Sequence, residues 1–204
     1  QVGQAVRSMA ASPIDASSVF AAVDQQTTGG VYRSYDGGRT WESNPLLANT
    51  GLSNRQVQAV AVCPSGQVFA GTWGGGVYRA DAASWTPVNG GIGEPYITDL
   101  DCDTQGRLFV GTFSKGVFRS TNAGASWNAV NSGLTNQSIL SIRSRDSRIF
   151  AGTESGAFSS ANGGDGWSPT GLQGHRILDF EFDPIDPQRL WVASTDAGRA
   201  QRSR

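Results

Sequence analysis

Residues 29–41 read GGVYRSYDGGRTW, and three later stretches repeat this phrase with small changes. They are GGVYRADAASW (75–85), KGVFRSTNAGASW (115–127) and SGAFSSANGGDGW (155–167). A second phrase precedes each one, in the forms VFAAV, VFAGT, LFVGT and IFAGT, and returns once more as LWVAS around Trp191. Both phrases keep the same order and a period of about 41 residues. The chain is therefore a tandem repeat.

Each repeat divides into four short segments of alternating hydrophobicity, separated by Gly, Asn, Ser, Asp or Pro, which is typical of antiparallel strands joined by tight turns. In the second repeat the segments are residues 57–63, 67–72, 76–80 and those that follow Trp85. Four strands in about 40–45 residues make one β-propeller blade, which buries its faces only against neighbouring blades. We predict an all-β propeller of four-stranded antiparallel blades, because a β-sandwich would not require so regular a period.

The repeats predict a single domain over residues 1–204. Its blades would span approximately residues 5–54, 55–95, 96–136, 137–174 and 175–204. The last repeat is incomplete, since it has no fourth strand and no closing Trp, and an exposed strand edge invites pairing. We expect a piece of a larger propeller of about six to eight blades, or a ring completed by another chain, more than a closed five-bladed ring.

The first strand of each repeat has aligned apolar positions that we expect to face the core. One column holds Val6, Val57, Ile97, Ile139 and Ile177, and the next holds Met9, Val60, Leu100, Ile142 and Phe180. A third column holds Ala11, Val62, Cys102, Ser144 and Phe182, and between it and the second column three successive repeats carry Asp101, Arg143 and Glu181. We expect Arg143 to pair with both carboxylates near the central channel, because buried charges need partners. A metal or catalytic site is the alternative.

The turn before the fourth strand is the most specific part of the repeat. An Asp or Asn side chain there can accept bonds from the turn amides, Gly allows a positive φ, and Trp covers the blade edge. The first repeat has the full pattern S-x-D-x-G-x-T-W at Ser34, Asp36, Gly38, Thr40 and Trp41. The third and fourth keep it at Ser120, Asn122, Gly124 and Trp127, and at Ser160, Asn162, Gly164 and Trp167. The second is two residues shorter and keeps Asp81 and Trp85.

On these residues the chain resembles the Asp-box, or bacterial neuraminidase repeat, propellers. This family includes sialidases, xyloglucanases, the Vps10 domain of sortilin-type receptors, and the photosystem II assembly and stability factors. The resemblance covers essentially the whole chain. It implies that the Asp-box residues stabilise turns on the face away from the ligand site. It also implies an extracytoplasmic location, whether periplasmic, secreted or lumenal, but a shared fold does not choose among enzymes, receptors and assembly factors.

In propellers of this family, ligands meet the loops that follow the second strand and those that precede the first. Here the loops after the second strand begin with Asp24, Trp73, Phe113, Glu154 and, in the incomplete repeat, Asp196, and Tyr96 lies in a loop before a first strand. These six residues are our candidate ligand-binding residues. Aromatic faces beside carboxylates suit stacking on a sugar and hydrogen bonding to it. Ordinary acidic loop residues and aromatic blade caps are the simpler interpretation.

Few residues point to catalysis. A glycosidase needs two carboxylates about 5 to 10 Å apart, and Glu154 and Asp196 are the pair that adjacent blades would bring to one face. A sialidase of this family would have an Arg-Ile-Pro start and three substrate-binding arginines, and this sequence shows neither that start nor a third such arginine. A xyloglucanase of this family would need two propellers. We expect a non-enzymatic binding or scaffold protein that docks a protein partner or assembly through its loops. The alternative is a carbohydrate-binding propeller, or a fragment of a sialidase- or xyloglucanase-type glycoside hydrolase.

Composition narrows the partners. The chain has 16 basic and 17 acidic side chains, so no basic field favours nucleic acid or an anionic membrane. No apolar run is long enough to span a membrane, and the first residues lack the pattern of a signal peptide. With His175 as the single histidine, we predict no metal site and no cofactor. We expect Cys102 to be a buried free thiol, with a disulfide to Cys63 as the alternative.

Overall fold

The computed structural model describes residues 5–43, 49–82, 84–186, 188–195 and 201–202. The regular elements of this part of the chain are nineteen β-strands in five antiparallel sheets. None of the described residues forms a helix long and apolar enough to cross a membrane.

The five sheets follow the five repeats of the sequence. The first contains β1 (Ala5–Ala11), β2 (Val19–Asp24), β3 (Gly30–Ser34) and β4 (Glu42–Ser43). The second contains β5 (Val57–Val62), β6 (Val68–Thr72), β7 (Gly76–Ala80) and β8 (Trp85–Pro87). The third contains β9 (Ile97–Cys102), β10 (Leu108–Thr112), β11 (Val117–Ser120) and β12 (Asn128–Ala129). The fourth contains β13 (Ile139–Arg145), β14 (Arg148–Thr153), β15 (Gly156–Ser160) and β16 (Ser168–Pro169), and the fifth β17 (Ile177–Phe182), β18 (Leu190–Ser194) and β19 (Gln201–Arg202).

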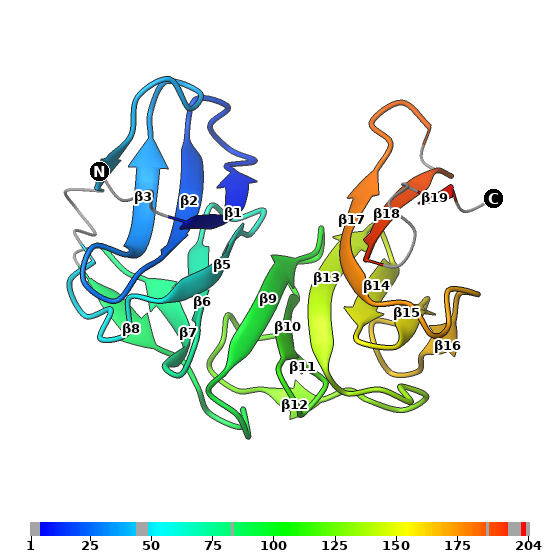
Figure 1. Ribbon diagram of the computed structural model, residues 1–204. Coiled ribbons are helices and arrows are strands. Elements are labelled where there is room, and N and C mark those ends of the chain that lie inside the picture. The colour runs from blue at the N-terminus through cyan, green and yellow to red at the C-terminus, as the bar shows by residue number, and fades with distance from the viewer. Residues whose placement is uncertain (1–4, 44–48, 83, 187, 196–200, 203–204) are drawn as a thin grey trace.

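Each sheet is a blade of an open propeller, as the sequence predicts. Figure 1 shows the blades following one another around an arc, with β1 and β17 on the two sides of its opening. The first strand of each blade packs against the first strand of the next. In the second blade, the strand bounds agree with the prediction to within one residue. The five blades do not close into a ring, so the arrangement fits an incomplete propeller.

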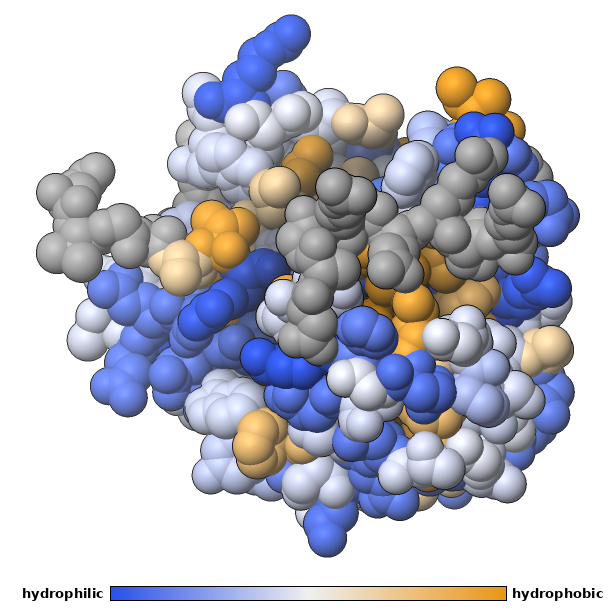
Figure 2. All heavy atoms as spheres, turned by 45° about the vertical axis from the view of Figure 1, so that its right-hand side comes forward, coloured by the Kyte–Doolittle hydropathy of each residue, from blue (hydrophilic) through white to orange (hydrophobic). Residues whose placement is uncertain are grey.

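The core lies between neighbouring blades, where the predicted apolar columns meet. Val57, Ile97, Ile139 and Ile177 are fully buried. Their counterpart Val6 is wrong as a core prediction, since it is 54% exposed, and so is Met9 at 65%. The physical reason is the open arc, in which no described blade covers the face of β1. The face of the molecule in Figure 2 is largely hydrophilic with separate hydrophobic patches.

A β-bulge near the start of each inner strand changes which residues face the centre of the arc. The register shifts once in every pair of first and second strands, at equivalent positions. An extra residue reverses the alternation of side chains along a strand. Beyond the bulges of β9 and β17 the alternation is regular, so Asp99 lies on the same side as Asp101, and Asp179 on the same side as Glu181.

The predicted ion pairs of Arg143 are wrong, because its partners are the carboxylates two residues earlier on each neighbouring strand. Arg143 pairs with Asp99 (Nη1 to Oδ2, 2.8 Å) and with Asp179 (Nη2 to Oδ1, 3.1 Å). The predicted partners lie one pleat further along: Glu181 is exposed, and Asp101 accepts hydrogen bonds from the backbone amide and hydroxyl of Ser144. Burial raises the pKa of Asp99, and it raises the pKa of Asp101 to about 6. The cluster links the third, fourth and fifth blades.

The expectation of a free thiol at Cys102 is also wrong, because Cys63 and Cys102 form a disulfide with their Cα atoms 5.2 Å apart. Cys63 directly follows β5 and Cys102 ends β9. Since β5 and β9 are neighbouring inner strands, residues at their ends come within bonding distance although the two cysteines differ by one position in the repeat. The disulfide joins the second blade to the third.

Candidate functional site

The Asp-box turns occupy one face of the arc, together with the turns between first and second strands; we call this the turn face. In the first blade, Gly38 donates its amide to Ser34 Oγ at 2.8 Å, and Thr40 donates its amide and hydroxyl to Asp36 at 2.9 and 2.6 Å. The hydrogen bonds from Thr40 lower the pKa of Asp36. In the third and fourth blades, Asn takes the place of Asp in the same hydrogen bonds. These bonds involve Ser120, Asn122 and Ser126 in the third blade, and Ser160, Asn162 and Gly166 in the fourth. These hydrogen bonds stabilise the turns. The candidate ligand-binding residues lie on the opposite face.

That opposite face, which we call the loop face, carries an aromatic cluster made by two neighbouring blades. The ring of Trp73 lies 5.1 Å from the ring of Tyr96 and 5.4 Å from that of Phe113, measured between centroids. Tyr96 is 41% exposed and Phe113 is 50% exposed. Three of the six candidate residues therefore form one solvent-facing patch, in which tilted and edge-to-face contacts fix the rings against one another.

The backbone around the cluster is tied down. Trp73 donates its amide to the carbonyl of Gln56 at 2.9 Å, and Phe113 donates its amide to the carbonyl of Tyr96 at 3.1 Å. Glu94 accepts from the amide and hydroxyl of Ser114, the residue after Phe113, at 2.7 and 3.0 Å. Because Glu94 is buried, its carboxylate positions the loop rather than meeting a ligand. Sequence reasoning did not select Glu94, whose only signal was an acidic residue two positions before Tyr96.

The two acidic candidates in the described chain are both bonded to arginines. Arg7 donates to Asp24 Oδ2 through Nε at 3.0 Å and through Nη2 at 2.8 Å. Arg176 contacts both oxygens of Glu154, at 2.5 Å from Nε and 3.0 Å from Nη2. These bonds pair the carboxylates of Asp24 and Glu154 with positive charges. Asp196 lies outside the described residues, so the expected pair of Glu154 with Asp196 is left as a prediction.

The arrangement offers a binding surface more readily than a reaction centre. Exposed aromatic faces can stack on apolar side chains or on sugar rings. Within the ranges that the structure describes, no three His, Cys, Asp or Glu side chains gather where they could hold a metal ion.

Comparisons with known proteins identify relatives by structure only, since no family model and no curated protein sequence matches the chain. A GH74 xyloglucanase from Xanthomonas campestris is similar over 98% of this chain and 35% of its own, with 19% identity and a TM-score of 0.71. YCF48 bound to a D1 peptide is similar over 96% and 63%, with 17% identity and a TM-score of 0.68. The extracellular domain of a putative hybrid two-component system from B. thetaiotaomicron is similar over 98% and 27%, with 18% identity and a TM-score of 0.72.

These likenesses establish the propeller fold and the structural resemblance to the xyloglucanase and to YCF48. The chain spans less than two thirds of the length of each of these structures. At such identities the shared fold does not carry over an activity, a substrate or a partner.

Proposed function

We propose that this chain is a non-enzymatic binding propeller that docks a partner polypeptide through its aromatic cluster of Trp73, Tyr96 and Phe113. The observation that carries the proposal is the packing of two exposed rings, Tyr96 and Phe113, against the half-buried ring of Trp73 on tied-down loops of adjacent blades. Aromatic groups of this kind are enriched where proteins bind one another, because they bury much surface at a small cost in side-chain entropy.

The state of the carboxylates supports binding over hydrolysis. A glycosidase requires one carboxyl group that carries a proton and a second that faces the sugar. Both oxygens of Glu154 already contact Arg176, and Asp24 is bonded to Arg7. A propeller of this fold whose structure contains a bound peptide, YCF48, provides a precedent for the proposed kind of partner.

We further propose that the protein works outside the cytoplasm. The disulfide between Cys63 and Cys102 fits an oxidising compartment. An extracellular domain among the similar structures agrees with this location.

The test is site-specific photo-crosslinking in the native host, with a photoreactive phenylalanine in place of Phe113. We expect one protein to be captured in stoichiometric amounts, and we expect the additional change Trp73→Ala to abolish the capture. Ile185 is 91% exposed on the turn face and provides the matched control position. Capture of the same protein from position 185, or capture that survives Trp73→Ala, would contradict docking at the cluster.

A glycan ligand is the second candidate, and the exposed ring of Phe113 is the observation that favours it. A glycan array with the purified chain separates the two functions. Binding of one sugar family that Phe113→Ala and Trp73→Ala both remove would replace the polypeptide with a carbohydrate. Hydrolysis of that sugar, lost in Glu154→Gln, would show that the protein is an enzyme.

A further inference from the structure

On the turn face of the third and fourth blades, a glycine of the complete Asp-box turn fills the space over a phenylalanine of the preceding blade. A Cβ placed on Gly124 in the third blade would lie 3.5 Å from the ring of Phe69 in the second. One placed on Gly164 in the fourth blade would lie 3.5 Å from the ring of Phe109 in the third. In both interfaces a glycine of the turn therefore covers a buried phenylalanine of the second strand.

An arginine on the third strand of the preceding blade holds each of these turns. Arg119 Nη1 donates to the carbonyl of Gly163 at 2.6 Å and to the carboxylate of Asp165 at 2.7 Å. Arg79 Nη1 makes the equivalent, longer contact with the carbonyl of Ala123 at 3.5 Å. In both interfaces a guanidinium donates a hydrogen bond to a turn carbonyl. In one of them it also donates to an acidic side chain.

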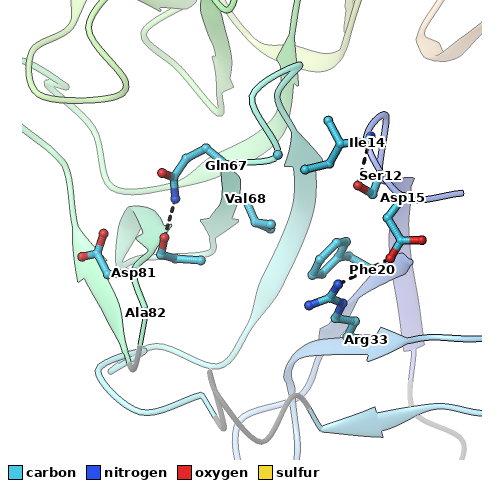
Figure 3. A pocket seen from close by; sticks show the side chains of 11 residues that line it. Ser12, Ile14, Asp15, Phe20, Arg33, Gln67, Val68, Asp81 and Ala82 are labelled. Atoms are coloured by element: carbon cyan, nitrogen blue, oxygen red, sulfur yellow. Dashed lines mark hydrogen bonds and ion pairs between the residues drawn. The ribbon is translucent and has the colours of Figure 1, made fainter. Parts of the chain in front are cut away.

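In the described part of the chain, the interface between the first and second blades lacks such a turn glycine over its phenylalanine, because the turn of the second blade is two residues shorter. A pocket of about 250 Å³ lies there. Its lining includes Phe20 and Arg33 from the first blade and Val68 and Asp81 from the second. Figure 3 shows Phe20 and Arg33 on one side of the pocket, with Val68 and Asp81 across from them. Phe20 and Arg33 hold the positions of the phenylalanine and the arginine in the two filled interfaces.

Arg33 is held in place but retains an unused donor. Its guanidinium lies over the rings of Phe20 and Tyr35, at 5.1 and 4.4 Å from their centroids, and its Nη2 donates to Ser18 Oγ at 2.6 Å. Its Nε is buried and has no hydrogen-bond partner among the residues that the structure describes. A buried donor without an acceptor costs free energy, which a ligand that supplies the acceptor recovers.

The nearby carboxylates leave this donor free. Asp15 accepts hydrogen bonds from Ser17 and Ser18, and it lies 3.9 Å from Arg33 Nη2. Asp81 is bonded to Arg79 and Thr86 of its own blade.

We propose that the pocket between the first and second blades binds a glycine-containing, acidic turn of a partner polypeptide. The partner's turn takes the place that complete Asp-box turns take in the next two interfaces, with a small residue over Phe20 and a carbonyl or carboxylate oxygen on Arg33. This site lies on the face opposite the aromatic cluster and does not depend on the function proposed for that cluster. The expected occupant follows from two interfaces of the same molecule: an arginine donates to a turn carbonyl in both, and to a carboxylate in one.

The test uses the acetylated and amidated peptide SANGGDG, the sequence of residues 160–166, as the probe. It is titrated into the full ¹⁵N-labelled chain. We expect saturable shifts of the Arg33 Nε–H signal and of the Gly66 and Val68 amides, with an affinity in the millimolar range, about what a short flexible ligand achieves. Peptides with Gly164→Val or Asp165→Asn leave the protein unchanged, and each should bind about fivefold or more weakly, because one loses the small residue and the other the charged acceptor.

The variant Arg33→Gln should lose the amide shifts, whereas Arg119→Gln, changed at the matching position of a filled interface, should keep them. The proposal is overturned if SANGGDG causes no shift at these residues, or if the altered peptides bind as well as the original. It is also overturned if succinate causes the shifts and the peptide does not, since the pocket would then take a small carboxylate. The peptide comparison stands even if Arg33→Gln fails to fold.

Discussion

Arg143 on β13 donates to Asp99 on β9 across the boundary between the third and fourth blades, at 2.8 Å. The same oxygen of Asp99 accepts the backbone amide of Ile142, also at 2.8 Å. A carboxylate of one blade thus receives both a side chain and the main chain of the next. This pair adds a charged link to the other hydrogen bonds between these two blades, and so helps to fix their register.

We expect Arg143→Met to destabilise the fold by about 2 to 3 kcal/mol, below the about 3–5 kcal/mol of a fully buried pair because Arg143 remains partly exposed. The change leaves the buried charge of Asp99 without its cation. Urea unfolding of the single variants and of Arg143→Met/Asp99→Asn measures the coupling. If the two single effects simply add, the pair does not act as described.

A second prediction concerns pH. Burial raises the pKa of Asp101 to about 6 in the folded protein, whereas the group titrates near 4 in an unfolded chain. The folded state therefore binds more protons in this window. The contribution of Asp101 to stability is fully present below about pH 4 and is lost as the pH rises through about 6.

The variant Asp101→Asn cannot titrate at this position, so it serves as the reference for the wild type. Between about pH 4 and pH 7 we expect the wild type to lose about 1 to 3 kcal/mol relative to Asp101→Asn. Chemical unfolding of both proteins at several pH values measures the difference, and carboxylates elsewhere cancel in the comparison. A difference that stays constant over this range would show that Asp101 does not titrate there.

The third prediction concerns the disulfide between Cys63 and Cys102, which encloses a chain segment with a sequence separation of 39. Reduction should cost about 2 to 4 kcal/mol, because the unfolded chain regains the entropy of that loop. Thermal unfolding with and without dithiothreitol measures the loss. The double variant Cys63→Ala/Cys102→Ala should start at the lower stability and should not respond to the reductant; a response would point to an effect elsewhere.

The fourth prediction tests how closely the Asp-box turn packs on the preceding blade. Gly124 has a φ of +81° and Gly106 a φ of +77°, so alanine is strained at both positions. Only at Gly124 would the added Cβ meet a neighbour, at 2.9 Å from Val88 Cγ2, whereas at Gly106 nothing lies within 4 Å. We expect Gly106→Ala to cost about 1 kcal/mol and Gly124→Ala about 1 kcal/mol more. Equal losses in urea unfolding would mean that the turn can move away from Val88.

Local patterns in the sequence were enough to predict the blades. The alternation in residues 57–63, 67–72 and 76–80 needs only neighbours along the chain, and it corresponds to β5, β6 and β7. The meeting of Trp73 with Phe113 also follows from the repeat, since equivalent loops of successive blades lie side by side.

Features that depend on small departures from the repeat could not be predicted in this way. Asp99 and Asp101 lie two residues apart on the same side of β9, and the aligned columns do not say which of them Arg143 reaches. The ion pair of Glu154 with Arg176 joins two loops whose relative height the sequence does not specify. The exposure of Met9 depends on what covers β1, which is not a property of β1 itself.

The covalent link between the second and third blades has a mechanical consequence. In an arc where each blade packs on its neighbours, tension applied to the chain ends would peel the blades away one at a time from the outside. The bond between Cys63 and Cys102 would withhold the enclosed segment, with its sequence separation of 39, from extension. At about 3.3 to 3.6 Å per residue, the fully extended chain with the disulfide would be roughly 130 Å shorter than the reduced chain. That shortfall would disappear under reducing conditions, so the end-to-end length of a single stretched molecule reports the redox state of its surroundings.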